Sequence, residues 1–169
     1  VSRIPVAPDV AEYNGKFYMS GNDCPLYVAD HPLGPYTLLG DWTNTGEISE
    51  GWNGAFDTHI FVDDDGSVYL YYVSWRSSYA IYGVKLDQNM NPVMSTEKRI
   101  IAPTEQWEKY EGNVTEGPYM LKHNGKYYLQ YAAIGLEFIS YSHGAYVSDS
   151  PMGPFTYSEH NPLTFKTSG

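Results

Sequence analysis

The sequence predicts an all-β protein, and three observations support this. Of its 169 residues, 16% are aromatic, which suits the pleated surfaces of strands, and 16 glycines and 11 prolines can supply the tight turns between strands. Only 18% of the residues are charged, so a chain of this length can bury a sizeable core. The third observation is an internal repeat, which also predicts how the strands are arranged.

The repeat is a short pattern that occurs three times, as NGKFYM from Asn14, DGSVYL from Asp65 and NGKYYL from Asn124. Each copy predicts a two-residue hairpin turn followed by a strand, because Asn, Asp and Gly tolerate the positive φ angles that such turns require. An apolar run before each turn supplies the first strand. Each repeat therefore begins with strand, turn and strand.

Two further strands complete each repeat. LYVADHPLGPYTLL in the first repeat aligns with AYVSDSPMGPFTYS in the third, and IYGVKLDQNMNPV supplies the outer strands of the second. The turn glycines Gly15, Gly66 and Gly125 are 51 and 59 residues apart, a spacing typical of four-stranded β-propeller blades. A sandwich or a jelly roll would also be all-β, but neither gives a reason for the repeat.

We therefore expect one partial β-propeller domain over residues 1–169, with blade-like repeats at about 1–50, 51–110 and 111–169. Propellers have at least four blades, and an unclosed ring would leave sheet edges exposed to other chains. The sequence is thus predicted to be a fragment of a larger domain. Its expected partners are the remaining blades of the same protein.

Charge and hydropathy argue against two classes of partner. The formal net charge is -10, with ten Lys and Arg against twenty Asp and Glu and no basic cluster, so neither nucleic acid nor an anionic membrane is expected to bind. The sequence contains no run of 18 or more apolar residues, so it predicts no membrane-spanning helix. Cys24 is the single cysteine, so no disulfide is expected within the chain.

Two acids occupy matching places when the repeats are aligned without a gap. Asp57 lies eight residues before Asp65, and Glu116 lies eight residues before Asn124, whereas the first repeat has Val6 at that place. Equivalent positions in a propeller lie on a ring around its axis, so the two carboxylates are expected to approach one another at one mouth of the channel.

Such a pair suits the cleavage of a glycosidic bond. Carboxylates brought together in a partly desolvated pocket raise the pKa of one of them, which can then stay protonated and act as an acid. Glycoside hydrolysis needs one acid to protonate the leaving oxygen and a second carboxylate as base or nucleophile. The alternative is that Asp57 and Glu116 only accept backbone N–H groups at the starts of strands.

Three segments carry a resemblance to a known family. APDV at Ala7, FDTHIFVDDDGSVYLYY from Phe56 and VTEGPYMLKHNGKYYLQYA from Val114 resemble glycoside hydrolase family 43, in the same order and over nearly the whole chain. The resemblance implies a five-bladed β-propeller enzyme acting on arabinose- and xylose-containing glycans, of which this chain would cover about blades two to four.

The resemblance also implies roles for the two acids. Members of this family use inverting hydrolysis with three carboxylates. The resemblance therefore implies that Glu116 is the general acid and that Asp57 orients it and modulates its pKa. The catalytic base has no counterpart here and would precede Val1. An oligo- or polysaccharide substrate, a secreted or periplasmic location and a structural calcium ion are further implications, although this chain itself shows no metal-ligand spacing and no cofactor motif.

Five more residues are candidates for substrate binding. His59 lies two residues after Asp57 on the same strand face, so it is placed to reach a sugar, although a purely structural histidine is the alternative. Trp75 and Arg76 follow a strand end of the second repeat. Glu137 and His143 lie in a segment of the third repeat that is nine residues longer, where propellers vary their binding surfaces.

Two other functions remain open at this point. One is a retaining propeller hydrolase of the fructosidase type, whose acid lies in a Glu-Cys segment rather than in the Glu-Gly-Pro found from Glu116. The other is a non-catalytic sugar-binding propeller. The DDDG segment from Asp63 is expected to be an acidic hairpin turn, since it lacks the alternating ligands and the distal Glu of a calcium loop.

Overall fold

A computed structural model describes residues 6–42, 55–76 and 78–164. Twelve strands lie in these ranges and form three antiparallel sheets of four strands each, with two short 3-10 helices between strands, η2 (Met94–Thr96) and η3 (Trp107–Lys109). The strands are β1 (Asp9–Tyr13), β2 (Lys16–Ser20), β3 (Pro25–Ala29) and β4 (Thr37–Asp41); β5 (Ala55–Val62), β6 (Val68–Ser74), β7 (Ala80–Leu86) and β8 (Lys98–Ile101); and β9 (Thr115–His123), β10 (Lys126–Ala133), β11 (Ser142–Ser148) and β12 (Thr156–Tyr157).

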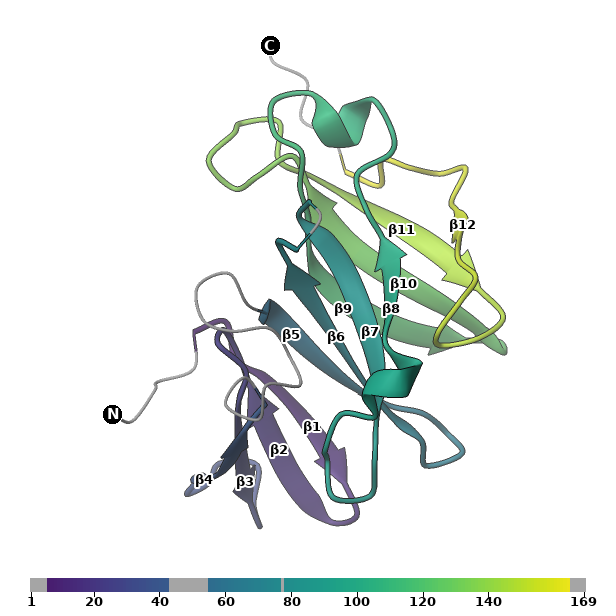
Figure 1. The fold of residues 1–169 in the computed structure, drawn as a ribbon. Coiled ribbons are helices and arrows are strands. Elements are labelled where there is room, and N and C mark those ends of the chain that lie inside the picture. Colours follow the sequence, from purple (N-terminus) through teal and green to yellow (C-terminus); the bar gives the residue numbers. More distant parts are fainter. Residues whose placement is uncertain (1–5, 43–54, 77, 165–169) are drawn as a thin grey trace.

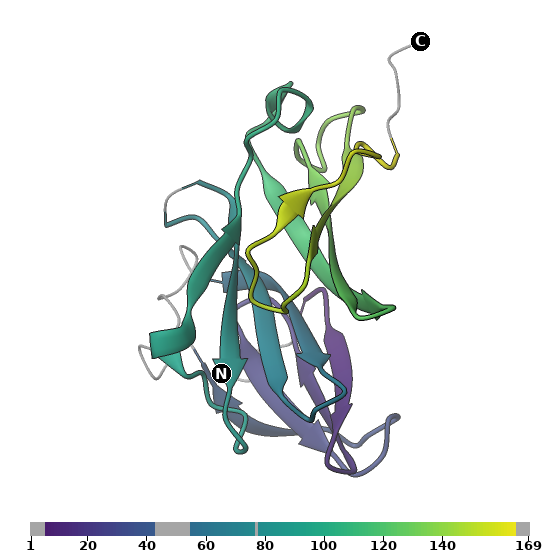
Figure 2. The same ribbon diagram turned by 90° about the vertical axis from the view of Figure 1, so that its right-hand side faces the viewer.

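The strands of each sheet follow one another in chain order, from an inner first strand to an outer fourth strand. Strand β1 contacts β5, and β5 contacts β9, so the first strands of the three sheets lie next to one another (Figure 1). The quarter-turned view in Figure 2 brings β12, the outer edge of the third sheet, toward the viewer. Consecutive four-stranded meanders with neighbouring first strands are blades of a β-propeller, as the repeat predicts.

The middle sheet is covered on both faces, and this explains the continuous apolar sequence of β6. Successive side chains of a strand point to opposite faces. Accordingly, Leu70 and Tyr72 pack in a cluster shared with the first sheet, whereas Tyr71 and Val73 pack in a cluster shared with the third sheet. All four side chains are fully buried. The second strand of the middle sheet therefore stabilises both seams between the sheets.

The first and third hairpins have the predicted two-residue turns. Tyr13 pairs with Lys16 across Asn14 and Gly15, whose φ angles are 51° and 72°. In the third sheet, Asn124 and Gly125 join β9 to β10 with φ angles of 49° and 75°. Two consecutive positive φ angles define the type I′ turn, which matches the twist of the flanking strands.

The prediction of a two-residue turn is wrong for the middle repeat. The ladder closes at Val62 and Val68, and the Asp63 N–H donates to the Ser67 carbonyl at 2.8 Å, so five residues form the loop. The longer loop turns the Asp63 carboxylate toward the third sheet, where Lys122 and Tyr127 donate to it, the latter at 2.6 Å. The acidic turn is therefore part of the seam between two sheets.

Candidate active site

Both acids lie beside β-bulges in the first strands of their sheets. In β5, Phe56 pairs with Val73 and His59 pairs with Tyr71, which leaves Asp57 and Thr58 together opposite Tyr72. The first residue of this bulge, Asp57, has a φ of +49°. A bulge of this kind bends the strand and redirects its side chains, and bulges are common next to active sites.

The first strand of the third sheet has the same bulge. Glu116 pairs with Ala132 and Tyr119 pairs with Gln130, so Gly117 and Pro118 stand together opposite one residue of β10. Gly117 is the left-handed residue here, with a φ of +57°. Glycine adopts this conformation without the steric cost that a side chain brings.

The registers show that the two acids are not at equivalent positions, contrary to the gap-free alignment. The counterpart of Asp57 is Gly117, and the counterpart of Glu116 is Phe56. Five residues separate the paired Val62 and Val68, whereas four separate the equivalent pair Lys122 and Tyr127. The extra residue in the middle turn shifts the first strand by one place.

The first sheet has Ala7, rather than Val6, at the place of Asp57. Ala7 precedes Asp9 by two residues, as Asp57 precedes His59, and it has the same left-handed backbone with a φ of 49°. No acid therefore stands at this position of the first sheet, as expected, although the residue that occupies it was assigned one place too early.

The two acids nevertheless meet. The backbone N–H of Gly117 donates to Asp57 Oδ2 at 3.1 Å, which places the Asp57 carboxylate beside the residue that follows Glu116. Glu116 is buried, with 8% of its surface exposed, and the Tyr141 hydroxyl donates to its Oε1 at 2.9 Å. The site therefore places the Asp57 carboxylate, which accepts a backbone N–H, near the Glu116 carboxyl group, which accepts the Tyr141 hydroxyl.

Burial raises the pKa of Glu116 above its ordinary value. The hydrogen bond from Tyr141 opposes this effect, whereas the negative charges of Asp57 and Glu137 add to it. Burial also raises the pKa of Asp57, and the Gly117 N–H opposes that shift by stabilising the carboxylate. Desolvation and neighbouring negative charge both disfavour ionisation, so Glu116 is placed to hold its proton at a higher pH than an exposed glutamate.

Two hollows in the surface adjoin the acids. The first, of about 340 Å³, lies between the three first strands and is lined by Asp57 together with Asp9, His59 and Tyr119. The second, of about 390 Å³, is lined by Glu116 and Glu137. A larger hollow of about 650 Å³ on the third sheet is lined by neither acid.

His59 is fixed by Asp9, a residue for which no role was predicted. Its Nδ1 lies 3.3 Å from Asp9 Oδ1, and its ring centroid is 4.6 Å from that of Tyr119. His59 is buried, and no side chain among the described residues bonds its Nε2. Both interpretations of this histidine thus have support, since it packs as a core residue and lines the Asp57 hollow.

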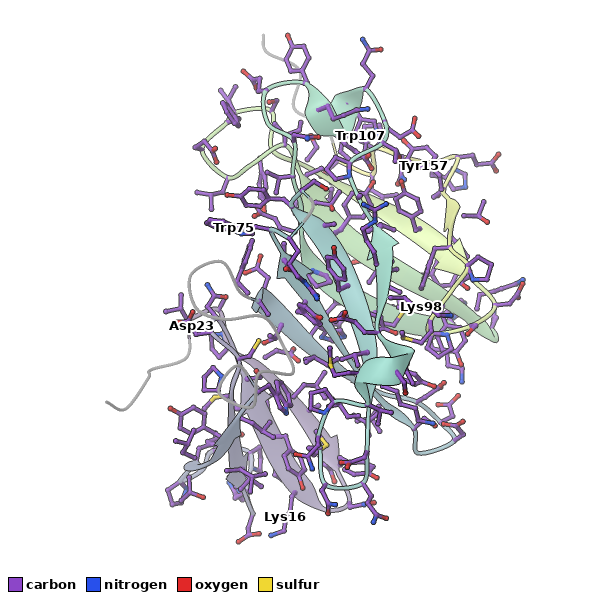
Figure 3. The ribbon with its side chains drawn as sticks, in the orientation of Figure 1. Lys16, Asp23, Trp75, Lys98, Trp107 and Tyr157 are labelled. Carbon is purple, nitrogen blue, oxygen red and sulfur yellow. The ribbon has the colours of Figure 1, made fainter. Side chains whose placement is uncertain are left out.

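Trp75 and Arg76 line neither hollow. Trp75 lies at one end of the middle sheet (Figure 3), with its ring stacked on Tyr79 at a centroid distance of 5.0 Å. The Arg76 guanidinium binds the Glu97 carboxylate at 2.8 Å and 3.2 Å. Their predicted contacts with a sugar stay predictions, and both side chains have packing partners in the chain.

Glu137 and His143 lie nearer to the acid. Glu137 is exposed and lines the Glu116 hollow. His143 bonds Thr164 through Nδ1, at 2.8 Å from Oγ1, and its ring stands edge-on to Tyr141 at 5.9 Å. The Asp57 N–H donates to Asn22 Oδ1 at 2.9 Å. Of the site residues, sequence reasoning missed Tyr141, Asp9 and Asn22, because their contacts join segments far apart in the chain.

The described residues offer no group of three His, Cys, Asp or Glu side chains that could hold a metal ion. The structural calcium ion that the family resemblance implies stays a prediction. The part of the chain that the structure describes also contains no helix able to cross a bilayer.

Comparison with known proteins decides the family. The family model described as "Glycosyl hydrolases family 43" matches residues 2–169. The chain belongs to this family. The relatives of this family 43 chain include an arabinoxylan arabinofuranohydrolase of Paenibacillus polymyxa, 33% identical over 190 residues, which cover 94% of this chain and 28% of the relative. A β-xylosidase of Xylanibacter ruminicola is 27% identical, over 88% of this chain and 54% of that protein.

Solved structures agree with this family assignment. An endo-1,4-β-xylanase from Bacteroides thetaiotaomicron superposes with a TM-score of 0.79 at 30% identity, over 93% of this chain and 54% of that one. A thermostable family 43 glycoside hydrolase gives 0.76 at 32% identity, over 95% and 55%. The all-β propeller fold of the family 43 chain is thus confirmed, and the chain spans about half the length of these proteins or less.

Proposed function

We propose that this chain is the part of an inverting glycoside hydrolase that carries the general acid, Glu116, and the residue that orients it, Asp57. The observation that carries the proposal is a buried glutamate whose pKa is raised, next to a second carboxylate that is anchored by the Gly117 N–H. Membership of family 43 supports the same interpretation. A sugar-binding module would have no need of a carboxyl group whose pKa is raised.

In the proposed mechanism, Glu116 gives its proton to the glycosidic oxygen as the bond to the leaving group breaks. Asp57 keeps its charge beside Glu116, which favours the protonated form of the acid before the reaction. Tyr141 donates to the carboxylate that remains afterwards. The base that activates water would come from residues outside this sequence, with its carboxyl group about 6.5–9.5 Å from that of Glu116 to leave space for the water.

The proposed substrates are arabinofuranosides or β-xylosides of arabinoxylan-type polysaccharides. The names of the relatives, which include arabinoxylan arabinofuranohydrolases and a β-xylosidase, support this choice. Polysaccharides of this kind are degraded outside the cytoplasm, so we also propose a secreted or periplasmic location.

The outer faces of the first and third sheets support the presence of further blades. Leu121 lies between buried and partly buried residues along β9 and is 45% exposed, and Val10 on β1 is 47% exposed. Apolar side chains on one face of a strand ordinarily pack against another layer. We propose that the remaining blades of the complete protein cover these faces.

The test is Glu116→Gln in the complete protein, with Asp149→Asn, an exposed carboxylate in the turn after β11, as the matched acid-to-amide control. Turnover of xylo- and arabino-oligosaccharides, which have poor leaving groups, is expected to fall by about 10²- to 10⁴-fold, because the proton donor is lost. Turnover of an activated aryl glycoside should fall far less.

Equal activity of Glu116→Gln and Asp149→Asn on oligosaccharides would refute the acid assignment. The stereochemistry of the first product, followed by NMR, distinguishes the inverting from the retaining mechanism. An initial product of inverted configuration is expected, whereas a retained configuration would indicate the fructosidase-type mechanism. Binding of oligosaccharides without any turnover by the wild type would indicate a non-catalytic propeller.

A further inference from the structure

The bulge that carries Asp57 is held in place by two side chains of the first sheet. Asn22, which follows β2, accepts a hydrogen bond at its Oδ1 from the Asp57 N–H, at 2.9 Å. Asp9, at the start of β1, accepts one at Oδ2 from the Ile60 N–H, at 2.8 Å. The same carboxylate contacts His59 through its other oxygen. Two side chains of one sheet thus bind the neighbouring strand on both sides of its bulge.

This bulge has a particular need for such support. Its first residue is an aspartate in the left-handed region, a conformation that is strained for residues with a side chain and persists where its surroundings determine it. A bulge also interrupts the ladder and leaves backbone N–H groups without their usual partners. Asn22 supplies an acceptor for one such group, the Asp57 N–H, and Asp9 supplies one for the Ile60 N–H just beyond the bulge. In the third sheet, glycine occupies the same place and the strain does not arise.

The contacts continue from the second sheet into the third. The Asp57 side chain, whose backbone is fixed by Asn22, accepts the N–H of Gly117, the residue after Glu116. A continuous path of hydrogen bonds therefore runs from Asn22 through Asp57 to the strand that carries the acid. The first sheet has Ala7 in place of an acid, but its side chains bind the strand that carries the acid of the second sheet.

We propose that Asp9 and Asn22 are positioning residues for the reaction, which fix the Asp57 carboxylate at its place beside Glu116. The inference rests on the proposed function, since it assigns the first sheet a part in the same site. Neither residue needs to touch the substrate. Each acts through the backbone of the bulge, and Asp9 also through His59, whose ring packs against Tyr119 in the same hollow.

The experiment compares Asn22→Ala and Asp9→Ala with Asn161→Ala, all in the complete protein. Asn161 makes the same kind of bonds, from Ala145 N to Oδ1 at 2.7 Å and from Nδ2 to Ala145 O at 2.8 Å, but it lines none of the hollows. Loss of either positioning residue is expected to lower kcat on oligosaccharides by about ten- to a hundredfold, as misplacement of a catalytic group does, with little change in KM. Asn161→Ala should keep the wild-type kcat.

A second readout does not depend on turnover. If Asp57 moves away, its charge no longer disfavours ionisation of Glu116, so the pKa of Glu116 measured by carbon NMR should fall in both variants. Tyr141 and Glu137, which also act on Glu116, are unchanged in these proteins. Asp9→Asn, which keeps an acceptor for the Ile60 N–H, should retain more activity than Asp9→Ala.

The outcomes separate the two proposals. If Asn22→Ala and Asp9→Ala have the same kcat and the same Glu116 pKa as Asn161→Ala, the positioning role of Asp9 and Asn22 is overturned. The proposed hydrolase function is then unaffected. A wild type without turnover, whose Glu116 pKa still falls in Asn22→Ala and Asp9→Ala, would overturn the proposed function and support the positioning role.

Discussion

The bulges of the second and third sheets differ in where they place an acid. Both interrupt the ladder at the same position and both begin with a left-handed residue, but the second sheet puts Asp57 on that residue, whereas the third puts Gly117 there and its acid one residue earlier. The one-residue difference gives the two carboxyl groups different surroundings. Asp57 is half-buried and accepts a backbone N–H, whereas Glu116 is buried against the Tyr141 hydroxyl.

This difference matches the division of labour that we propose. Burial raises the pKa of both acids, and the Gly117 N–H limits the rise at Asp57 because it stabilises the carboxylate. A buried carboxyl group next to that charge is favoured in its protonated form. The same bulge can therefore serve either role, depending on which of its residues carries the acid.

Among substitutions at the left-handed residues of the bulges, the largest expected effect comes from Asp57→Gly, which makes the second bulge like the third. Glycine removes the acceptor for Gly117 and the charge beside Glu116, so kcat on oligosaccharides should fall by about 10²-fold. Ala7→Gly is the matched control, because Ala7 has the same left-handed backbone in the first sheet. It relieves the same strain without removing an acid, and it should keep full activity. Steady-state kinetics of both variants decide this, and equal activities would contradict the role of Asp57.

An intermediate effect is expected from Gly117→Ala, which gives the third bulge a side chain like the second. No heavy atom lies within 4 Å of the added Cβ, so the cost comes from the left-handed backbone alone, about 1–2 kcal/mol of the free energy of unfolding. Gly117→Asn should lose less, because asparagine tolerates this conformation. Denaturant unfolding of the two variants measures the difference, and an alanine variant as stable as wild type would show that the strain is relieved elsewhere.

The smallest expected effects are shifts in the pH dependence of kcat/KM. Its basic limb reports the deprotonation of the general acid. Tyr141→Phe removes a donor that favours the Glu116 carboxylate, so the pKa of Glu116 and the basic limb should both move to higher pH. Glu137→Gln removes a negative charge that disfavours the carboxylate, so the limb should move to lower pH.

The two substitutions near Glu116 thus serve as controls for each other. High salt should weaken the effect of Glu137→Gln, since Glu137 is exposed and its charge is screened, but not that of Tyr141→Phe. Shifts of the same sign in both variants would mean that another group sets the basic limb.

The arrangement of strands could be predicted from the sequence, because turn chemistry and strand alternation are local properties. The turns at Asn14 and Asn124 formed as expected, and the apolar run of β6 follows from burial on both faces. The acids were also found by counting from the turns. Their register was wrong by one, since an Asp-Gly pair within DDDGS does not reveal that the loop holds an additional residue.

The supporting residues could not be predicted from such local patterns. Asn22 binds a residue 35 positions away, Asp9 one 51 positions away and Tyr141 one 25 positions away. Each contact joins two segments that come together in space only through the packing of whole sheets or the course of a long loop. A single sequence carries no spacing rule for such pairs.

The hydrogen bonds of Asp57 have a consequence for how the site comes into being. One bond crosses the seam to the first sheet and another crosses the seam to the third, so no single sheet contains the arrangement of the two acids. A sheet that has formed all of its own ladder bonds still has no catalytic geometry. We therefore expect the proposed activity to depend on the docking of blades against one another, so a substitution that only loosens a seam would abolish turnover while every strand remains intact.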